Sequence, residues 1–138
     1  MAAEKLQREL GAAVINLAGK ATLRQTAAVL KRCELFIGND AGPMHMAAAV
    51  GVPVIEISCQ HRGGSSLEAN SPTRFGPWGV ENVVLQPENA TGNCGETCEA
   101  EMAHCILGVT VEQVVKAVMQ IMKQARVRIS RDVAAASQ

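Results

Sequence analysis

The segment from Leu35 to Ile57 constrains the fold most, because it alternates short apolar runs with a helix-compatible stretch. The runs 35–37 and 52–57 are too short for helices, and turn-forming Gly, Asn and Asp residues follow the first of them. Between the runs, Pro43 favours the first position of a helix, which Gly51 is expected to end. A strand, a helix and a second strand in this order imply a right-handed crossover. The segment therefore predicts neighbouring parallel strands in an α/β sheet.

The N-terminal part of the chain carries two further helix signals and one strand signal. Residues 3–10 suit a helix that a glycine stops, and the apolar residues 13–15 predict a buried strand. Thr22 and Gln25 have the spacing of a capping box, in which each side chain binds the other residue's backbone N–H. A helix is therefore expected to follow this pair and to end near residue 33.

The C-terminal half begins with a long loop and ends with a helix. Residues 58–77 are rich in Gly, Ser, Asn and Pro, which predicts a loop of the kind that is often functional, and residues 83–85 predict a last strand. Thr110 and Gln113 repeat the capping-box spacing, and apolar residues follow on one helical face. We expect that face to pack on the sheet; its members are Val111, Val114, Val115, Val118, Met119 and Met122.

Length and composition fit one domain. The chain has 138 residues, of which 48% are hydrophobic, so it is long enough and apolar enough to bury a core. Four expected strands with helices on both faces predict a three-layer α/β arrangement with a parallel sheet. We place this sheet in residues 1–125 and a polar, basic tail in residues 126–138.

The charge balance and the aromatic content argue against nucleic acid as a partner. Thirteen basic residues balance thirteen acidic ones, and aromatic residues make up 2% of the chain.

No apolar stretch approaches the roughly 20 residues that span a bilayer, and the first eleven residues lack a signal-peptide core. Five cysteines without a secretion signal favour reduced thiols. We expect a cytoplasmic protein with at most peripheral membrane contact.

The turn that follows the predicted strand at residues 35–37 carries the candidate chemistry. Residues 38–54 read GNDAGPMHMAAAVGVPV, so a strand ends in a glycine-containing turn that opens a helix. The free backbone N–H groups of Met44 and His45 in the first turn favour an anion such as a diphosphate. Gly42 lets a phosphate approach the backbone, and Asp40 could accept hydrogen bonds from sugar hydroxyls. At this positive helix end we expect His45 to be neutral.

A purely structural interpretation of the same residues stays equally open from local chemistry alone. In that interpretation Asp40 caps the helix, Gly42 and Pro43 are turn residues, and His45 is a packed or surface histidine.

A longer pattern gives the turn a family context. The run NLAGKATLRQTAAVLKRCELFIGNDAGPMHMAAAVGVPV, from Asn16 to Val54, closely resembles the donor-binding half of glycosyltransferase family nine, the bacterial lipopolysaccharide heptosyltransferase family. The similarity continues in NSPTRFGPWG and in HCILGVTVEQVVKAV. The Asp-x-Gly-Pro-x-His spacing together with the upstream AGKATL is a specific signal.

The resemblance implies a GT-B architecture, in which two Rossmann-like domains face a cleft and the C-terminal one holds the nucleotide sugar. This chain resembles part of that C-terminal domain. The implied donor is ADP-heptose, the implied acceptor is a lipopolysaccharide core, and no cofactor is required. The implied place is the bacterial cytoplasm, at the inner face of the inner membrane. By resemblance, the diphosphate and sugar are lined by Asp40, Ala41, Gly42 and His45, and the adenosine by Lys20, Ala21 and Thr22.

Several residues depart from the family pattern or stay ambiguous. Ala41 stands where the motif usually has threonine, so one hydroxyl contact to phosphate is missing, and the loop ISCQHRGGSSLEANSP is longer and more polar than usual. Arg74 is a candidate for pairing with a phosphate or for the acceptor side, and Trp78 is expected to be a packing anchor. A zinc site fits the spacing poorly, so we predict no metal; its ligands would be Cys94, Cys98, His104 and Cys105.

The resemblance also leaves the activity of this chain open. In the family, transfer inverts the anomeric centre, and the general base comes from the N-terminal domain, to which no segment here corresponds. Two alternatives therefore stand beside a heptosyltransferase. One is a non-catalytic nucleotide-binding module that needs a partner chain, and the other is a nucleotide-sugar epimerase.

Overall fold

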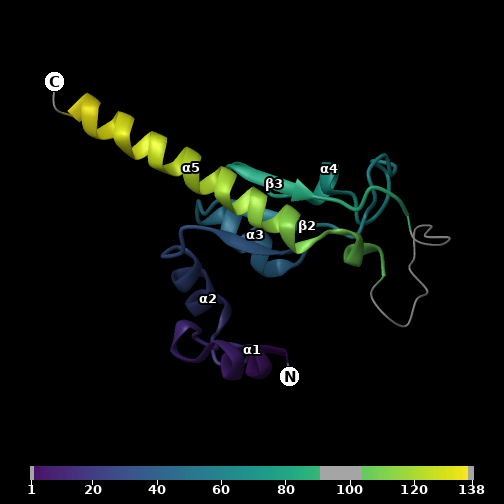
Figure 1. Cartoon of the computed structure of the whole chain (residues 1–138), viewed down its shortest axis with the longest axis horizontal. Coiled ribbons are helices and arrows are strands. Elements are labelled where there is room, and N and C mark those ends of the chain that lie inside the picture. The colour runs from purple at the N-terminus through teal and green to yellow at the C-terminus, as the bar shows by residue number, and fades with distance from the viewer. Residues whose placement is uncertain (1, 91–103, 137–138) are drawn as a thin grey trace.

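The computed structural model describes residues 2–90 and 104–136, with side chains described from residue 3 to residue 127 outside the same gap. Three parallel strands form one sheet in the order β1-β2-β3, as Figure 1 shows. The strands are β1 (Phe36–Asn39), β2 (Val54–Ile57) and β3 (Asn82–Leu85). The helices are α1 (Ala2–Leu10), α2 (Leu23–Leu30), α3 (Gly42–Ala49), α4 (Pro72–Phe75) and α5 (Val111–Ala136), with short 3-10 turns η1 (Gly11–Ala13) and η2 (Cys105–Gly108).

The crossover from β1 through α3 to β2 confirms the predicted parallel arrangement. Ile37 pairs with Ile55 and Gly38 with Glu56, in parallel register. Helix α3 ends as predicted, since Gly51 has a φ of 86°, a left-handed backbone conformation that glycine adopts readily.

Each face of the sheet is covered by a different helix, which confirms the three-layer architecture. On one face, Val54 belongs to a buried cluster with Leu30 of α2 and with Met44 and Ala47 of α3. The next residue, Ile55, points to the other face and packs with α5. This alternation follows from the two-residue period of a strand. Because both faces are covered, β2 is apolar almost throughout, as expected of a central parallel strand.

Both predicted capping boxes are present and fix the starts of their helices. Thr22 N donates to Gln25 Oε1 over 2.9 Å, and Gln25 N donates to Thr22 Oγ1 over 3.4 Å. The same pair of hydrogen bonds joins Thr110 and Gln113, at 2.7 and 3.3 Å. Reciprocal bonds of this kind satisfy backbone donors that the first turn of a helix leaves free.

The strand predicted at residues 13–15 was wrong. Ala13 is the last residue of the 3-10 turn η1, the segment pairs with no strand of the described sheet, and Ile15 is 83% exposed. The described part of the chain therefore has three strands where we expected four. Without a neighbouring strand to pair with, a short apolar run does not form a strand.

The predicted core face of the last helix was only partly right. Val114, Val118 and Met122 are half-buried, but Val111, Val115 and Met119 are exposed. The most buried residues are Ala117 and Ile121, so the true contact stripe is shifted around α5. Helix α5 also continues to Ala136, through the segment predicted as a tail.

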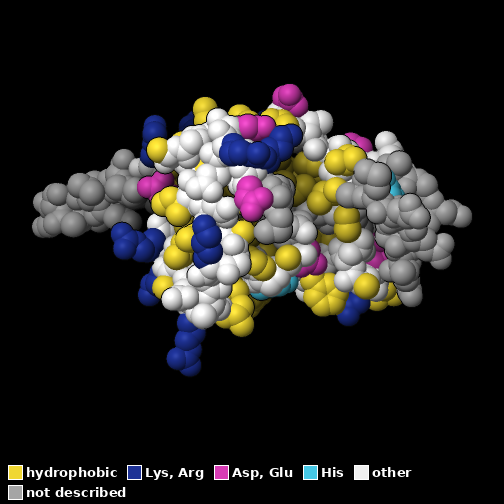
Figure 2. Space-filling view, turned by 90° about the horizontal axis from the view of Figure 1, so that it is seen from below, with side chains coloured by type: hydrophobic (Ala, Val, Ile, Leu, Met, Phe, Trp, Pro, Cys, Tyr) yellow, Lys and Arg dark blue, Asp and Glu magenta, His cyan; other side chains and the backbone are white. Residues whose placement is uncertain are grey.

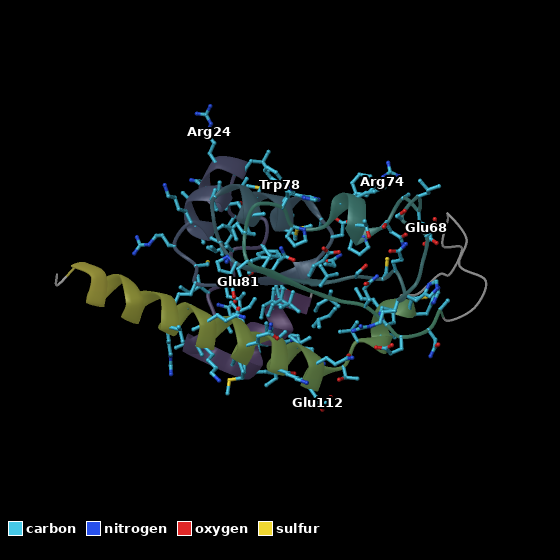
Figure 3. All side chains as sticks on the ribbon, turned by 90° about the horizontal axis from the view of Figure 1, so that it is seen from above. Arg24, Glu68, Arg74, Trp78, Glu81 and Glu112 are labelled. Atoms are coloured by element: carbon cyan, nitrogen blue, oxygen red, sulfur yellow. The ribbon has the colours of Figure 1, made fainter. Side chains whose placement is uncertain are left out.

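Trp78 was predicted as a packing anchor, and this was also wrong. Its side chain is 89% exposed, on a turn next to Gly79, and Figure 3 shows it on the side of the molecule opposite Glu112 of α5. Figure 2 shows other apolar side chains lying among charged ones on the molecular surface. Within the described residues no helix is long and apolar enough to cross a membrane.

Two alanine substitutions on different faces of α5 test which face contacts the sheet. Ile121→Ala is expected to destabilise the fold by about 2–5 kcal/mol, because the side chain is fully buried against Ile55. Met119→Ala is expected to cost less than about 0.5 kcal/mol, because Met119 is 69% exposed. Urea unfolding followed by circular dichroism measures both, and equal losses would show that Met119 is part of the core.

Candidate functional site

The predicted site residues lie where β1 ends and α3 begins, at the carboxyl edge of the sheet. Asp40 and Ala41 connect the two elements, and Ala41 is the N-cap residue of α3, with extended backbone angles and no side-chain capping bond. Asp40 therefore does not cap the helix, contrary to the purely structural interpretation. Its Oδ1 atom lies 3.1 Å from Nε2 of His45, one turn into α3.

The Asp40–His45 pair faces solvent at the edge. The side chains are 29% and 49% exposed, respectively, so the pair is accessible to a ligand. A Cβ atom added at Gly42 would meet nothing within 4 Å, so there is open space beside this residue in the first turn of α3. One predicted feature was wrong: the N–H of Met44 is not free, because it donates to Ala41 O over 2.9 Å. The helix begins at Gly42, one residue earlier than expected, which closes this short bond.

The residues predicted to lie near an adenosine sit at the start of the neighbouring helix. Thr22 caps α2, and the backbone N–H of Lys20 donates to Leu17 O over 3.0 Å. Helix α2 packs against α3, so Lys20, Ala21 and Thr22 belong to the same helical layer as the Asp40–His45 pair. Among the described residues no hydrogen bond joins the two groups.

Arg74 lies in the loop after β2, on α4. Its Nη1 atom donates to Leu67 O over 3.1 Å, and its guanidinium lies 4.8 Å from the centroid of the Phe75 ring. Figure 3 shows Arg74 on the same side of the molecule as Trp78. The side chain is exposed and helps to hold the loop, and its predicted pairing with a phosphate stays a prediction.

The proposed zinc ligands lie partly outside the described residues. Cys94 and Cys98 fall in the gap between residues 90 and 104. His104 Nδ1 lies 3.0 Å from Cys105 Sγ. In the part of the chain that the structure describes, no three His, Cys, Asp or Glu residues are grouped as metal ligands.

The structure adds one residue that the sequence analysis missed. Glu56 lies in the middle of β2, directly opposite Gly38 in register, and it is completely buried. Neither of its carboxylate oxygens has a hydrogen-bond partner. The signal in the sequence is a single glutamate inside the apolar run VPVIEI. The run predicts a strand, and this prediction gives the glutamate no role.

Burial and a neighbouring charge make Glu56 a weak acid. Removal from water raises its pKa from the ordinary value of 4.5 to about 7, and the negative charge of Asp40 adds to the rise. Gly76, at the end of the segment Pro72–Gly76, lies next to the carboxyl group, since a Cβ added there would lie 3.4 Å from Glu56 Oε2. Ser71, at the start of this segment, is buried with an unpartnered hydroxyl.

Parallel strands with a helix start and an ionisable pair at their carboxyl edge define a Rossmann-like α/β protein with a candidate anion site at that edge. A family model narrows this class. Residues 1–104 match glycosyltransferase family 9 (heptosyltransferase), and the chain belongs to this family.

Curated relatives and a solved structure agree with this assignment. The chain is 34% identical over 83 residues to a lipopolysaccharide core heptosyltransferase of Haemophilus influenzae, covering 59% of this chain and 21% of that protein. It is 28% identical over 124 residues to lipooligosaccharide heptosyltransferase 2 of Campylobacter jejuni, covering 86% and 35%. The crystal structure of a family 9 glycosyl transferase from Veillonella parvula aligns with a TM-score of 0.58 and 26% identity, over 77% of this chain and 28% of that one. The chain thus spans about a third or less of the length of these proteins.

The uncapped start of α3 predicts a stabilising substitution. Ala41→Thr is expected to raise the free energy of unfolding by about 0.5–2 kcal/mol, because a hydroxyl at an extended N-cap accepts a hydrogen bond from the first turn. Urea unfolding measures the change. Ala41→Val is the matched control, since it adds the same β-branched shape without an oxygen; an equal gain with valine would rule out capping as the cause.

The buried carboxyl group predicts a specific pH dependence of stability. Because the folded-state pKa of Glu56 lies above its unfolded value, its contribution is complete below pH 4.5 and is lost as the pH rises toward 7. Glu56→Gln removes this dependence. Between pH 4.5 and 8, wild type should lose up to about 3 kcal/mol relative to the variant. Urea unfolding of both proteins at each pH measures the difference, and parallel pH profiles would contradict the assignment.

Proposed function

We propose that this chain is the nucleotide-sugar-binding part of a heptosyltransferase, with ADP-heptose as donor and a lipopolysaccharide core as acceptor. The observation that carries the proposal is the accessible Asp40–His45 pair at the open first turn of α3. It stands at the edge of a parallel sheet where ligands of α/β proteins bind, in a chain of a heptosyltransferase family.

The chemistry of the site fits the two halves of such a donor. The positive end of α3 and the exposed backbone around Gly42 suit the diphosphate. The Asp40 carboxylate suits sugar hydroxyls, which donate hydrogen bonds to it, and the bond to His45 holds it in place. Lys20, Ala21 and Thr22, in the same helical layer, suit the adenosine.

Transfer also needs a group that takes the proton of the attacking hydroxyl. We propose that the base belongs to a domain outside this chain, as the family resemblance implies, and that transfer with inversion requires it. The site in this chain would then bind and orient the donor. In this proposal the protein acts in the bacterial cytoplasm, at the inner face of the inner membrane.

Calorimetry with ADP and ADP-heptose tests the donor site. Wild type is expected to bind both ligands with dissociation constants in the millimolar range or lower. Asp40→Ala should weaken ADP-heptose binding by roughly tenfold and ADP binding less, because the lost carboxylate contacts the sugar. Glu34→Gln is the control, since it removes an exposed carboxylate before β1, at the opposite end of that strand. A folded wild-type protein that binds neither ligand would overturn the proposal.

A second candidate is a non-catalytic nucleotide-binding module that needs a partner chain. It is favoured by the exposed apolar stripe of Val111, Val115 and Met119 on α5. Light scattering after size exclusion, combined with a transfer assay, separates the two candidates. A stable monomer that transfers heptose unaided would exclude the partner-dependent module.

A further inference from the structure

Glu56 has no role in the proposed binding of the donor, yet it lies next to the residues of the candidate site. Gly38 pairs with Glu56, and Asp40 follows Gly38 by two residues. Asp40 lies just beyond the end of β1, so it stands at the carboxyl edge of the sheet next to the Gly38–Glu56 pair. Their charges interact, because Asp40 acts on the ionisation of Glu56. Asp40 in turn contacts His45. The three ionisable groups therefore form a row from the sheet interior to the start of α3.

No cation in the surroundings described here compensates a charge on Glu56. Val84 lies opposite it on β3, and the Pro72–Gly76 segment, whose Gly76 lies next to the carboxyl group, carries one charged residue, Arg74. The guanidinium of Arg74 is turned to Leu67 O and the Phe75 ring. His45, at the start of α3, contacts Asp40. An ionised Glu56 would thus place a second negative charge behind the anion site, without a hydrogen bond of its own.

We propose that Glu56 is a positioning residue whose proton controls the affinity of this edge for a diphosphate: the neutral carboxyl group permits binding, and the ionised one opposes it. This inference rests on the proposed donor site. The proposal requires no contact between Glu56 and the ligand, because the negative charge of ionised Glu56 repels a diphosphate at the start of α3 through space. By linkage, a bound diphosphate also favours the protonated form of Glu56.

Titration of ADP-heptose into wild type and Glu56→Gln between pH 5.5 and 8.5 tests the proposal. The diphosphate of this ligand is esterified at both ends, so the ligand contributes no titration in this range. His45 is present in both proteins, so the ratio of their dissociation constants isolates Glu56. The ratio of wild type to variant is expected to rise roughly five- to tenfold from pH 6 to pH 8. Glu34→Gln should keep the wild-type profile. A constant ratio would overturn the proposal.

A ligand-free measurement separates this proposal from the donor site itself. In a 15N-labelled protein, the amide resonances of Asp40 and Gly42 should shift with a titration that Glu56→Gln removes. If wild type binds no ADP-heptose at any pH, the donor site is wrong, and the amide shifts alone decide whether Glu56 acts on the start of α3. Unchanged amide titration in Glu56→Gln would overturn the proposal whether or not the ligand binds.

Asp40→Asn is a second variant. It should lower the pH at which the Glu56-dependent amide shift occurs, because it removes the neighbouring negative charge.

Discussion

The parallel pairing of β1 with β2 is the constraint on which the rest of the structure depends. A parallel pair needs a crossover, and α3 is that crossover, so its first turn must stand at the carboxyl edge where β1 ends. The same register sets Gly38 opposite Glu56 and leaves Asp40 just beyond the sheet. The open helix start, the Asp40–His45 pair and the buried glutamate therefore follow from one pairing.

The sequence predicted the elements next to the site well, because their signals are local. Both capping boxes use side chains three residues apart, and the β1–α3–β2 unit combines short apolar runs with Gly and Pro at its turns. Such signals depend on backbone chemistry within a few residues, which tertiary packing leaves unchanged. The grouping of Asp40, Gly42 and His45 could be predicted for the same reason, since one turn separates them.

The errors concern properties that neighbouring elements determine. Residues 13–15 are as apolar as a strand, but the described sheet offers them no pairing partner. On α5, apolar residues lie on two neighbouring faces, and the sheet contacts the face that contains Ala117 and Ile121. Trp78 has the largest side chain of its loop, yet it is 89% exposed. Periodicity identifies an apolar stripe and does not tell which neighbour, if any, buries it.

Glu56 and Ala41 show how the site trades stability for an exposed, charge-sensitive edge. An apolar residue at position 56 would suit a central parallel strand better, and a hydroxyl at position 41 would cap α3. Both features cost stability at the same few residues where the candidate ligand site lies, whereas the cores on both faces of the sheet follow ordinary packing rules. Departures from local stability that gather at one edge are typical of functional sites. The uncompensated carboxyl group is the more informative of the two, because a buried glutamate with no hydrogen bond acts electrostatically on its surroundings through its charge and its proton.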